Sequence, residues 1–235
     1  MKKLLFLCLA LSLAACEDDI KDVTEKNIPE TPPRGLKMKM KAGYFTHEFF
    51  YHSNGFVDSI SISRNNITSE KFIYNNLNQI VEVHYHSGHP DFPEYDKDEI
   101  TYYTYNSLDQ IDTAETYDKN NTLVRSESYT YNSDGSVNNP SMIVKDENLI
   151  LQKTGTDTSA YMFDSFRNPY YNIYPKAYRT IKYINKNNII ERKDTFGGTT
   201  LVYPSVLKYN SQNYIIEQRI QNAPLDSDDY NEFFY

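Results

Sequence analysis

Short runs in which apolar and polar positions alternate recur along this chain, and each is followed by a polar turn and an aliphatic residue. The clearest copies are FFYHSNGFV at 49–57, FIYNNLNQI at 72–80, YTYNSLDQI at 103–111 and YTYNSDGSV at 129–137. Alternation with a period of two is typical of a half-buried strand, and a tight polar turn between two such runs is typical of a β-hairpin. Each copy therefore predicts one hairpin.

The copies align on a tyrosine near the end of the first strand, which we call the anchor. The anchors are Tyr51, Tyr74, Tyr105, Tyr117, Tyr131, Tyr183 and Tyr209. Four positions later stands a residue that tolerates a left-handed backbone, namely Gly55, Asn78, Asp109, Asn121, Gly135, Asn187 or Asn213. Six positions after the anchor stands an aliphatic residue, namely Val57, Ile80, Ile111, Leu123, Val137, Ile189 or Ile215. We expect each turn to close at the first of these positions and the second strand to begin at the other.

The spacing of the anchors predicts a single meander. The intervals from Tyr105 to Tyr131, from Tyr183 to Tyr209 and from Tyr209 to Tyr235 are each 26 residues, so one strand with its turn takes about 13 residues. No helical periodicity is evident, and open sheets of more than about ten strands usually curl or split. The predicted fold class is all-β: an antiparallel meander of repeated β-hairpins forming a strongly twisted, curled sheet or roll.

The repeat fails in one place, between Tyr131 and Tyr183. The copy expected near residue 157 lacks its aromatic anchor, and residues 161–178 instead hold seven aromatics together with Pro169 and Pro175. Because prolines are excluded from central strands, we expect this segment to leave the meander as a long loop. Its aromatics would either plug the curled sheet or stay exposed as a ligand surface, with Tyr170, Tyr171 and Tyr174 as its candidates. We favour the plug, because burial removes a large apolar area from water.

Composition fits a sheet with aromatic residues inside and polar residues outside. The chain has 22 Tyr, 12 Phe and no Trp, and we expect most repeat tyrosines to pack across strands instead of contacting ligands. At the start of the domain, LKMKMKAG alternates lysine with apolar residues. That pattern suits an edge strand whose charges oppose sheet-to-sheet aggregation.

The N-terminus carries the clearest functional signal. Lys2 and Lys3 precede an apolar run, residues 4–13, that is too short to span a bilayer and has the layout of a secretory signal. It ends in Leu-Ala-Ala-Cys at 13–16, which resembles the lipobox of bacterial lipoproteins. The resemblance implies cleavage before Cys16 and lipidation of that residue, so that removal of 15 of the 235 residues leaves a mature chain of 220. Cys8 leaves with the signal, so no thiol remains for disulfides, catalysis or metal binding.

The predicted organisation is a signal peptide at 1–15, a lipidated cysteine with an acidic, Pro-containing tether at 16–36, and one repeat domain at 37–235. Glu17, Asp18 and Asp19 resemble the export signal that sends some Gram-negative lipoproteins to the outer face of the outer membrane. The expected partner is thus the membrane, through the lipid anchor. Loss of Lys2 and Lys3 leaves 22 basic residues against 32 acidic ones, a net charge of −10, which argues against nucleic acid.

The hairpin phrase resembles the YD repeats of Rhs-type and teneurin-type proteins over the stretches around 49–137 and 181–215. In that motif Tyr-Asp is followed by two variable residues, Gly, Arg and an aliphatic residue. Here Asn usually follows the anchor, and the Arg slot holds Phe56, Gln79, Gln110 or Ser136. In large YD proteins the repeats wrap a shell around a cargo, and this chain has too few copies for one. The closer resemblance is to short surface lipoproteins of unknown function that also carry a segment like RNPYYNI at 167–173.

Other chemistry-bearing motifs are sparse. His84, His86 and His89 form H-x-H-x-x-H, and the first two would share one face of a strand, within reach of one metal ion. The acidic run that follows could offer oxygens to Ca²⁺ but fits no EF-hand, and solvated loop residues are the simpler account. No sequence motif of the common hydrolases or nucleotide-binding enzymes occurs. We therefore expect no enzyme and no cofactor.

Four functions remain open at this point. The first is a non-enzymatic surface lipoprotein that binds a partner or serves an outer-membrane protein complex. The second is a lipoprotein that captures a glycan or nutrient, which the absence of Trp disfavours. The third is an enzyme using carboxylates or the histidines, and the fourth is a membrane-spanning barrel, suggested by the terminal Phe234 and Tyr235.

Overall fold

The computed structural model describes residues 39–42, 45–63, 67–89, 91–92, 94, 96–221 and 230–235. Within them the chain forms strands joined mostly by short turns, and one short helix. The elements are β1 (Lys39–Ala42), β2 (Phe45–Tyr51), β3 (Val57–Ser63), β4 (Ile67–Tyr74), β5 (Ile80–Gly88), β6 (Lys97–Tyr105), β7 (Ile111–Asp118), β8 (Leu123–Ser128), β9 (Met142–Lys145), β10 (Asn148–Thr154), β11 (Asp157–Arg167), α1 (Lys176–Ile181), β12 (Asn187–Phe196), β13 (Thr199–Tyr209), β14 (Ile215–Ile220) and β15 (Tyr230–Phe234).

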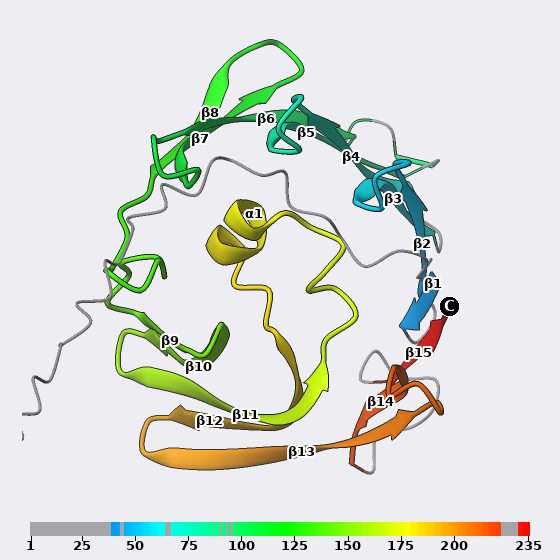
Figure 1. Cartoon of the computed structure of the whole chain (residues 1–235), viewed down its shortest axis with the longest axis vertical. Coiled ribbons are helices and arrows are strands. Elements are labelled where there is room, and N and C mark those ends of the chain that lie inside the picture. Colours follow the sequence, from blue (N-terminus) through cyan, green and yellow to red (C-terminus); the bar gives the residue numbers. More distant parts are fainter. Residues whose placement is uncertain are drawn as a thin grey trace, which may run out of the picture.

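The strands form one antiparallel sheet in the order β8-β7-β6-β5-β4-β3-β2-β1-β15-β14-β13-β12-β11-β10-β9. Figure 1 shows this sheet curled around α1, with β8 and β9 at its two edges. The curled all-β meander predicted from the sequence is thereby confirmed. The edges do not pair with each other within the described residues, so the curl stays open on that side.

The alternating lysines predicted an edge strand at 39–42, but this strand lies inside the sheet. β1 pairs with β2 on one side and with β15 on the other, where Met40 lies opposite Phe233. Met40 and Phe233 are 7% and 4% exposed. The two ends of the repeat domain therefore meet in the middle of the sheet, because a meander that curls back brings its first and last strands together.

The turns follow the repeat closely. Positive φ angles occur at six of the seven predicted positions, namely Gly55, Asn78, Asp109, Asn121, Gly135 and Asn213. In the turn after β4, the side-chain oxygen of Asn75 accepts hydrogen bonds from the backbone N–H groups of Leu77 and Gln79. Asn106 and Asn210 do the same in their turns. Asn suits this position because its side-chain oxygen can accept hydrogen bonds from the backbone N–H groups of the turn.

Three of the seven anchor tyrosines, and Tyr235 at the same spacing after Tyr209, join one hairpin to a neighbouring one. Tyr105 donates its hydroxyl to the backbone oxygen of Ile80 at 2.8 Å. Three further tyrosines repeat this bond at 2.6–2.8 Å: Tyr74 to Val57, Tyr131 to Ile111, and Tyr235 to Ile215. The four acceptor residues are only 0–1% exposed. The repeat is thus a packing device in which a phenol satisfies a buried carbonyl of the preceding hairpin.

Tyr105→Phe is expected to lower the free energy of unfolding by about 1 kcal/mol, because the Ile80 carbonyl would lose one buried hydrogen bond. Urea denaturation would measure the change. Tyr102→Phe serves as the matched control, since Tyr102 is 41% exposed on the same strand. Equal effects of the two substitutions would contradict the role assigned to the anchor.

The copy centred on Tyr183 is not a hairpin, and this prediction was wrong. Tyr183 follows α1 with φ of 51°, whereas Asn187 begins β12 and is not among the residues with positive φ. Tyr178 and Ile181 of α1 are each 6% exposed. Burial of these helical side chains inside the curl outweighs the local alternation that favoured a strand.

The predicted loop at 161–178 begins later than expected. Tyr161, Phe163 and Phe166 belong to β11, and the chain leaves the sheet only at residue 168. The reason is that Pro169 and Pro175 both lie beyond the end of β11, so neither proline interrupts its hydrogen bonding. In the part of the chain that the structure describes, no helix is long and apolar enough to cross a membrane.

Candidate functional site

Residues 168–186, which connect β11 to β12 and include α1, fill the interior of the curl, and we call them the plug. Tyr171, Tyr174 and Tyr178 are 6–7% exposed. The rings of Tyr174 and Tyr178 meet Phe72 of β4 edge-on, with centroids 5.5 and 5.8 Å away. The backbone N–H of Val57 donates to the oxygen of Ile173 at 3.0 Å, which ties the plug to the sheet.

The packing of the plug distinguishes between the two roles considered for the aromatic segment, an interior plug and an exposed ligand surface. Tyr170 packs between Phe49 and Phe233, from β2 and β15. Burial raises the pKa of Tyr170, Tyr174 and Tyr178 well above the ordinary tyrosine value, so their hydroxyls stay neutral. Tyr170 and Tyr174 therefore form interior packing, whereas Tyr171, although only 6% exposed, also lines the pocket described below.

One side of the interior is closed only by irregular chain. Residues 129–141 span the gap between the edge strands β8 and β9, and we call this side the seam. The hairpin phrase at 129–137 forms its turn there, but its second strand is reduced to a single bridge between Tyr131 and Val137. The chain enters this phrase directly from β8, whose residues are all exposed.

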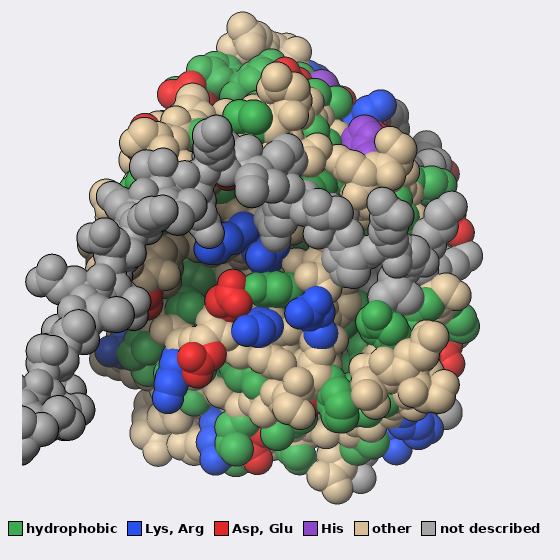
Figure 2. Space-filling view, in the orientation of Figure 1, with side chains coloured by type: hydrophobic (Ala, Val, Ile, Leu, Met, Phe, Trp, Pro, Cys, Tyr) green, Lys and Arg blue, Asp and Glu red, His purple; other side chains and the backbone are tan. Residues whose placement is uncertain are grey.

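A pocket of about 490 Å³ opens at the seam, and we call it the seam pocket. Figure 2 looks onto the end of the curl where this pocket lies, and charged side chains of both signs surround a hollow there. The wall comes from the 132–136 turn, the β9–β10 hairpin and the plug. Its lining residues are Asp134, Gly135, Ser136, Val137, Val144, Asp146, Glu147, Leu149, Tyr171, Lys176, Arg179, Thr180, Tyr183 and Ile184.

The charged groups of the seam pocket hold one another in place. Arg179 is 8% exposed, lies 4.2 Å over the ring of Tyr171, and donates to the backbone oxygen of Tyr174 at 3.1 Å. The Nζ of Lys186 is 3.4 Å from a carboxylate oxygen of Glu147. Burial opposes the charge of Glu147, but a hydrogen bond from Tyr171 and the positive charges of Lys186 and Arg179 hold its pKa below the ordinary value.

Tyr171 stays a neutral donor inside this network. Burial, together with its hydrogen bond to Glu147, raises the pKa of Tyr171 to about 12. The wall of the pocket is therefore fixed by a buried arginine, a phenol and a carboxylate, while Val144, Leu149 and Ile184 provide apolar surface. Such a mixture of apolar surface and a few placed polar groups is typical of a ligand pocket, and the volume lies in the usual range for one.

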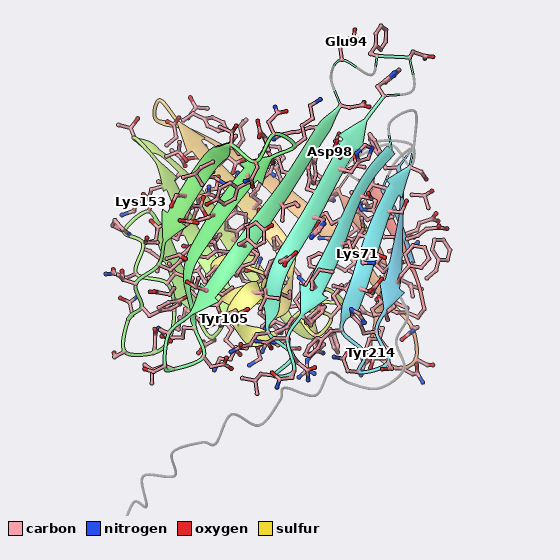
Figure 3. All side chains as sticks on the ribbon, turned by 90° about the horizontal axis from the view of Figure 1, so that it is seen from above. Lys71, Glu94, Asp98, Tyr105, Lys153 and Tyr214 are labelled. Atoms are coloured by element: carbon pink, nitrogen blue, oxygen red, sulfur yellow. The ribbon has the colours of Figure 1, made fainter. Side chains whose placement is uncertain are left out.

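The histidines are arranged differently from a metal site. His84 Nε2 lies 2.8 Å from a carboxylate oxygen of Glu82, and His86 Nδ1 lies 2.7 Å from one of Asp98. His89 is 4.0 Å from Asp91 in the loop beyond β5. Among the residues that the structure describes, no group of three His, Cys, Asp or Glu side chains is placed to hold a metal ion. Figure 3 shows Asp98 and Glu94 at the end of the sheet opposite to Tyr105.

Zinc is expected to leave the melting temperature of the protein unchanged, because each histidine has its own carboxylate partner and the three rings do not converge. Differential scanning fluorimetry with and without Zn²⁺ would measure this. The His84→Ala, His86→Ala double variant is the control for adventitious binding. A stabilisation by zinc that this variant loses would restore the metal-site hypothesis.

Sequence reasoning named one residue of the seam pocket, Tyr171, and missed the rest of it. Glu147 and Arg179, its central charged residues, belong to no motif, and they lie 32 positions apart in the sequence. The only available signal was the failure of the repeat between Tyr131 and Tyr183, which marks both the seam and the plug. The predicted lipidation site Cys16 and the acidic residues Glu17, Asp18 and Asp19 lie outside the described residues.

No protein-family model matches the chain, and a comparison with curated protein sequences finds no relative. Among solved structures, the chain is similar to a porin-like protein from Bacteroides uniformis, with 8% identity and a TM-score of 0.39 over 86% of this chain and 98% of that chain. It is also similar to a Tc holotoxin pore of Photorhabdus luminescens, with 14% identity and a TM-score of 0.28 over 80% of this chain and 8% of that chain. Similarities this remote place the chain in no family and assign it no activity.

Proposed function

We propose that this protein is a non-enzymatic binding lipoprotein, anchored in the outer membrane through Cys16, that holds its ligand in the seam pocket. The observation that carries the proposal is the pocket itself, which opens where the hairpin repeat is broken and is lined by both the sheet and the plug. Other tyrosines have partners within the fold: Tyr74, Tyr105 and Tyr131 donate to backbone oxygens, and Tyr174 and Tyr178 are buried.

The arrangement of charges favours binding over proton transfer. Glu147 is held ionised by Tyr171, Lys186 and Arg179, and Tyr171 is held neutral by burial. A general acid or base works best with a pKa near the operating pH, and these two groups are shifted away from it. Fixed charges of this kind suit the orientation of a polar ligand.

The location rests on the sequence of the N-terminus. A lipobox-like Cys16 followed by Glu17, Asp18 and Asp19 supports a lipid-anchored protein that faces outward from the outer membrane. There it would act alone or with an outer-membrane protein complex. A glycan is the alternative ligand, since Tyr171 and Tyr183 contribute aromatic rings to the pocket wall.

Titration of the ¹⁵N-labelled lipoprotein in detergent tests the proposal. The probes are a series of N-acetyl amino-acid amides and, separately, glucose and N-acetylglucosamine. We expect an amide probe to shift the backbone signals of residues 134–137 and 146–149, which line the pocket. Shifts by the sugars alone would support the glycan alternative, and no shift with any probe would contradict ligand binding at the seam.

Val144→Trp provides the matched variant, because a larger side chain at this lining position fills the pocket. It should abolish the shifts. Val124→Trp is the control, since Val124 lies on the edge strand β8, is 50% exposed and is not part of the pocket wall. Equal loss of binding in both variants would show that the shifts do not depend on the seam pocket.

A further inference from the structure

The hydrogen bonds from anchor tyrosines to backbone oxygens define a recurring site beside the hairpin turns, which we call a slot. The hydroxyls of Tyr74, Tyr105 and Tyr131 reach the carbonyls of Val57, Ile80 and Ile111. These acceptors stand six positions after the anchors Tyr51, Tyr74 and Tyr105; the copy at Tyr117 is skipped. The ring lies beside the preceding turn on its way there. Tyr74, for example, stacks on Phe56 with centroids 6.0 Å apart and planes 12° apart, and meets His52 edge-on at 5.1 Å. A slot thus has two parts: the side chains of a turn, which contact the tyrosine ring, and a backbone carbonyl, which accepts its hydroxyl.

The copy at 129–137 has such a slot, but no following anchor occupies it. Its residue six positions after the anchor is Val137, which is 8% exposed and lines the seam pocket. Ser136 stands at the position equivalent to Phe56, and it lines the same pocket. The missing tyrosine is the one that the repeat spacing places near residue 157, where the sequence is TGTDT.

The carbonyl oxygen of Val137 accepts hydrogen bonds from other donors than the carbonyl oxygens of the filled slots. It receives the backbone N–H of Asn139 at 3.0 Å and the side-chain amide of Asn132 at 3.5 Å. Among the described residues, no tyrosine hydroxyl donates to it. Tyr183, the tyrosine of the pocket wall, has its hydroxyl 3.3 Å from the side-chain nitrogen of Asn139 instead. A carbonyl oxygen has two lone pairs, so a phenol that donates to Val137 takes the place of the Asn132 amide, whose contact at 3.5 Å is the longer of the two.

We propose that the seam pocket binds a phenol, the side chain of a tyrosine, which takes the place of the missing anchor and donates to the Val137 carbonyl. This inference rests on the proposed function and names the ligand class of the same pocket. Val144, Leu149 and Ile184 offer apolar contacts to a ring. Lys176 and Asp146 add a positive and a negative charge to the wall, which suits the dipolar backbone that flanks such a side chain.

The test compares two probes that differ by one hydroxyl, N-acetyl-tyrosinamide and N-acetyl-phenylalaninamide, titrated into the ¹⁵N-labelled lipoprotein. We expect the tyrosine probe to bind at least fivefold more tightly, because only its hydroxyl can occupy the acceptor. Equal affinities would overturn the phenol slot while leaving a binding pocket in place. Binding of neither probe, together with failure of every other amide and sugar, would remove the proposed function as well.

Two further measurements keep the result specific. Intermolecular nuclear Overhauser effects from the probe ring should reach the methyl groups of Val137 and Val144, and contacts confined to any other region would overturn the assignment. This measurement uses the wild-type protein, so it stands even where Val144→Trp fails to fold. Free L-tyrosine is the third probe: weaker binding than the amide assigns the slot to a tyrosine within a peptide, and equal or tighter binding assigns it to the amino acid.

Discussion

Replacement of Tyr170, Tyr171 and Tyr174 together by serine is expected to lower the melting temperature sharply. Tyr171 and Tyr174 are 6% and 7% exposed, and Tyr170 packs against Phe49 and Phe233. Removal of a large buried aromatic ring costs about 3–5 kcal/mol. Because neighbouring sites are not additive, we expect a total loss of about 6 kcal/mol or more. That loss corresponds to a fall of about 12–24 °C for a chain of this size.

The matched control replaces three exposed aromatics of the sheet, Phe50, Tyr102 and Phe196, by serine. These are 51%, 41% and 44% exposed, so their loss removes little buried apolar surface, and the melting temperature should change by only a few degrees. Thermal unfolding followed by circular dichroism measures both variants. A plug variant as stable as this control would contradict the packing role of residues 168–186.

Cys16→Ala is expected to release the protein from the membrane or to leave it unprocessed. The predicted signal is cleaved before this cysteine, whose acyl chains supply the membrane affinity, and more than one chain is needed for stable anchoring. Cell fractionation and metabolic labelling with palmitate would measure the effect. Cys8→Ala is the matched control, because Cys8 lies within the predicted signal and leaves with it.

Protease added to intact cells tests the side of the membrane. An outward-facing protein should be degraded before lysis, since the predicted tether at 16–36 would place the whole domain outside. Replacement of Glu17, Asp18 and Asp19 by alanine should then protect the protein, if these residues direct export. Full protection of the wild-type protein until lysis would refute surface exposure.

Local sequence determined the hairpins of this protein. Gly, Asn or Asp stands where the backbone turns left-handed, as at Asn78 and Asp109, because few other residues accept that conformation without strain. The alternation of each strand places residues such as Phe72 and Ile80 on the buried face. Both signals act within a few residues, so they can be recognised without knowledge of the rest of the chain. The curl followed from the number of strands alone.

Tertiary structure decided what the local pattern could not. Residues 181–187 carry the repeat pattern, yet Ile181 ends α1 and no hairpin forms there, because Tyr178 and Ile181 gain more from burial within the curl than from pairing in the sheet. β1 has the alternation of an edge strand, yet it is central because the curl brings β15 beside it. The seam pocket joins residues from 134 to 184. Its existence depends on the packing of the plug beside the 132–136 turn and the β9–β10 hairpin. Contacts between such distant parts of the chain leave no periodic trace in the sequence.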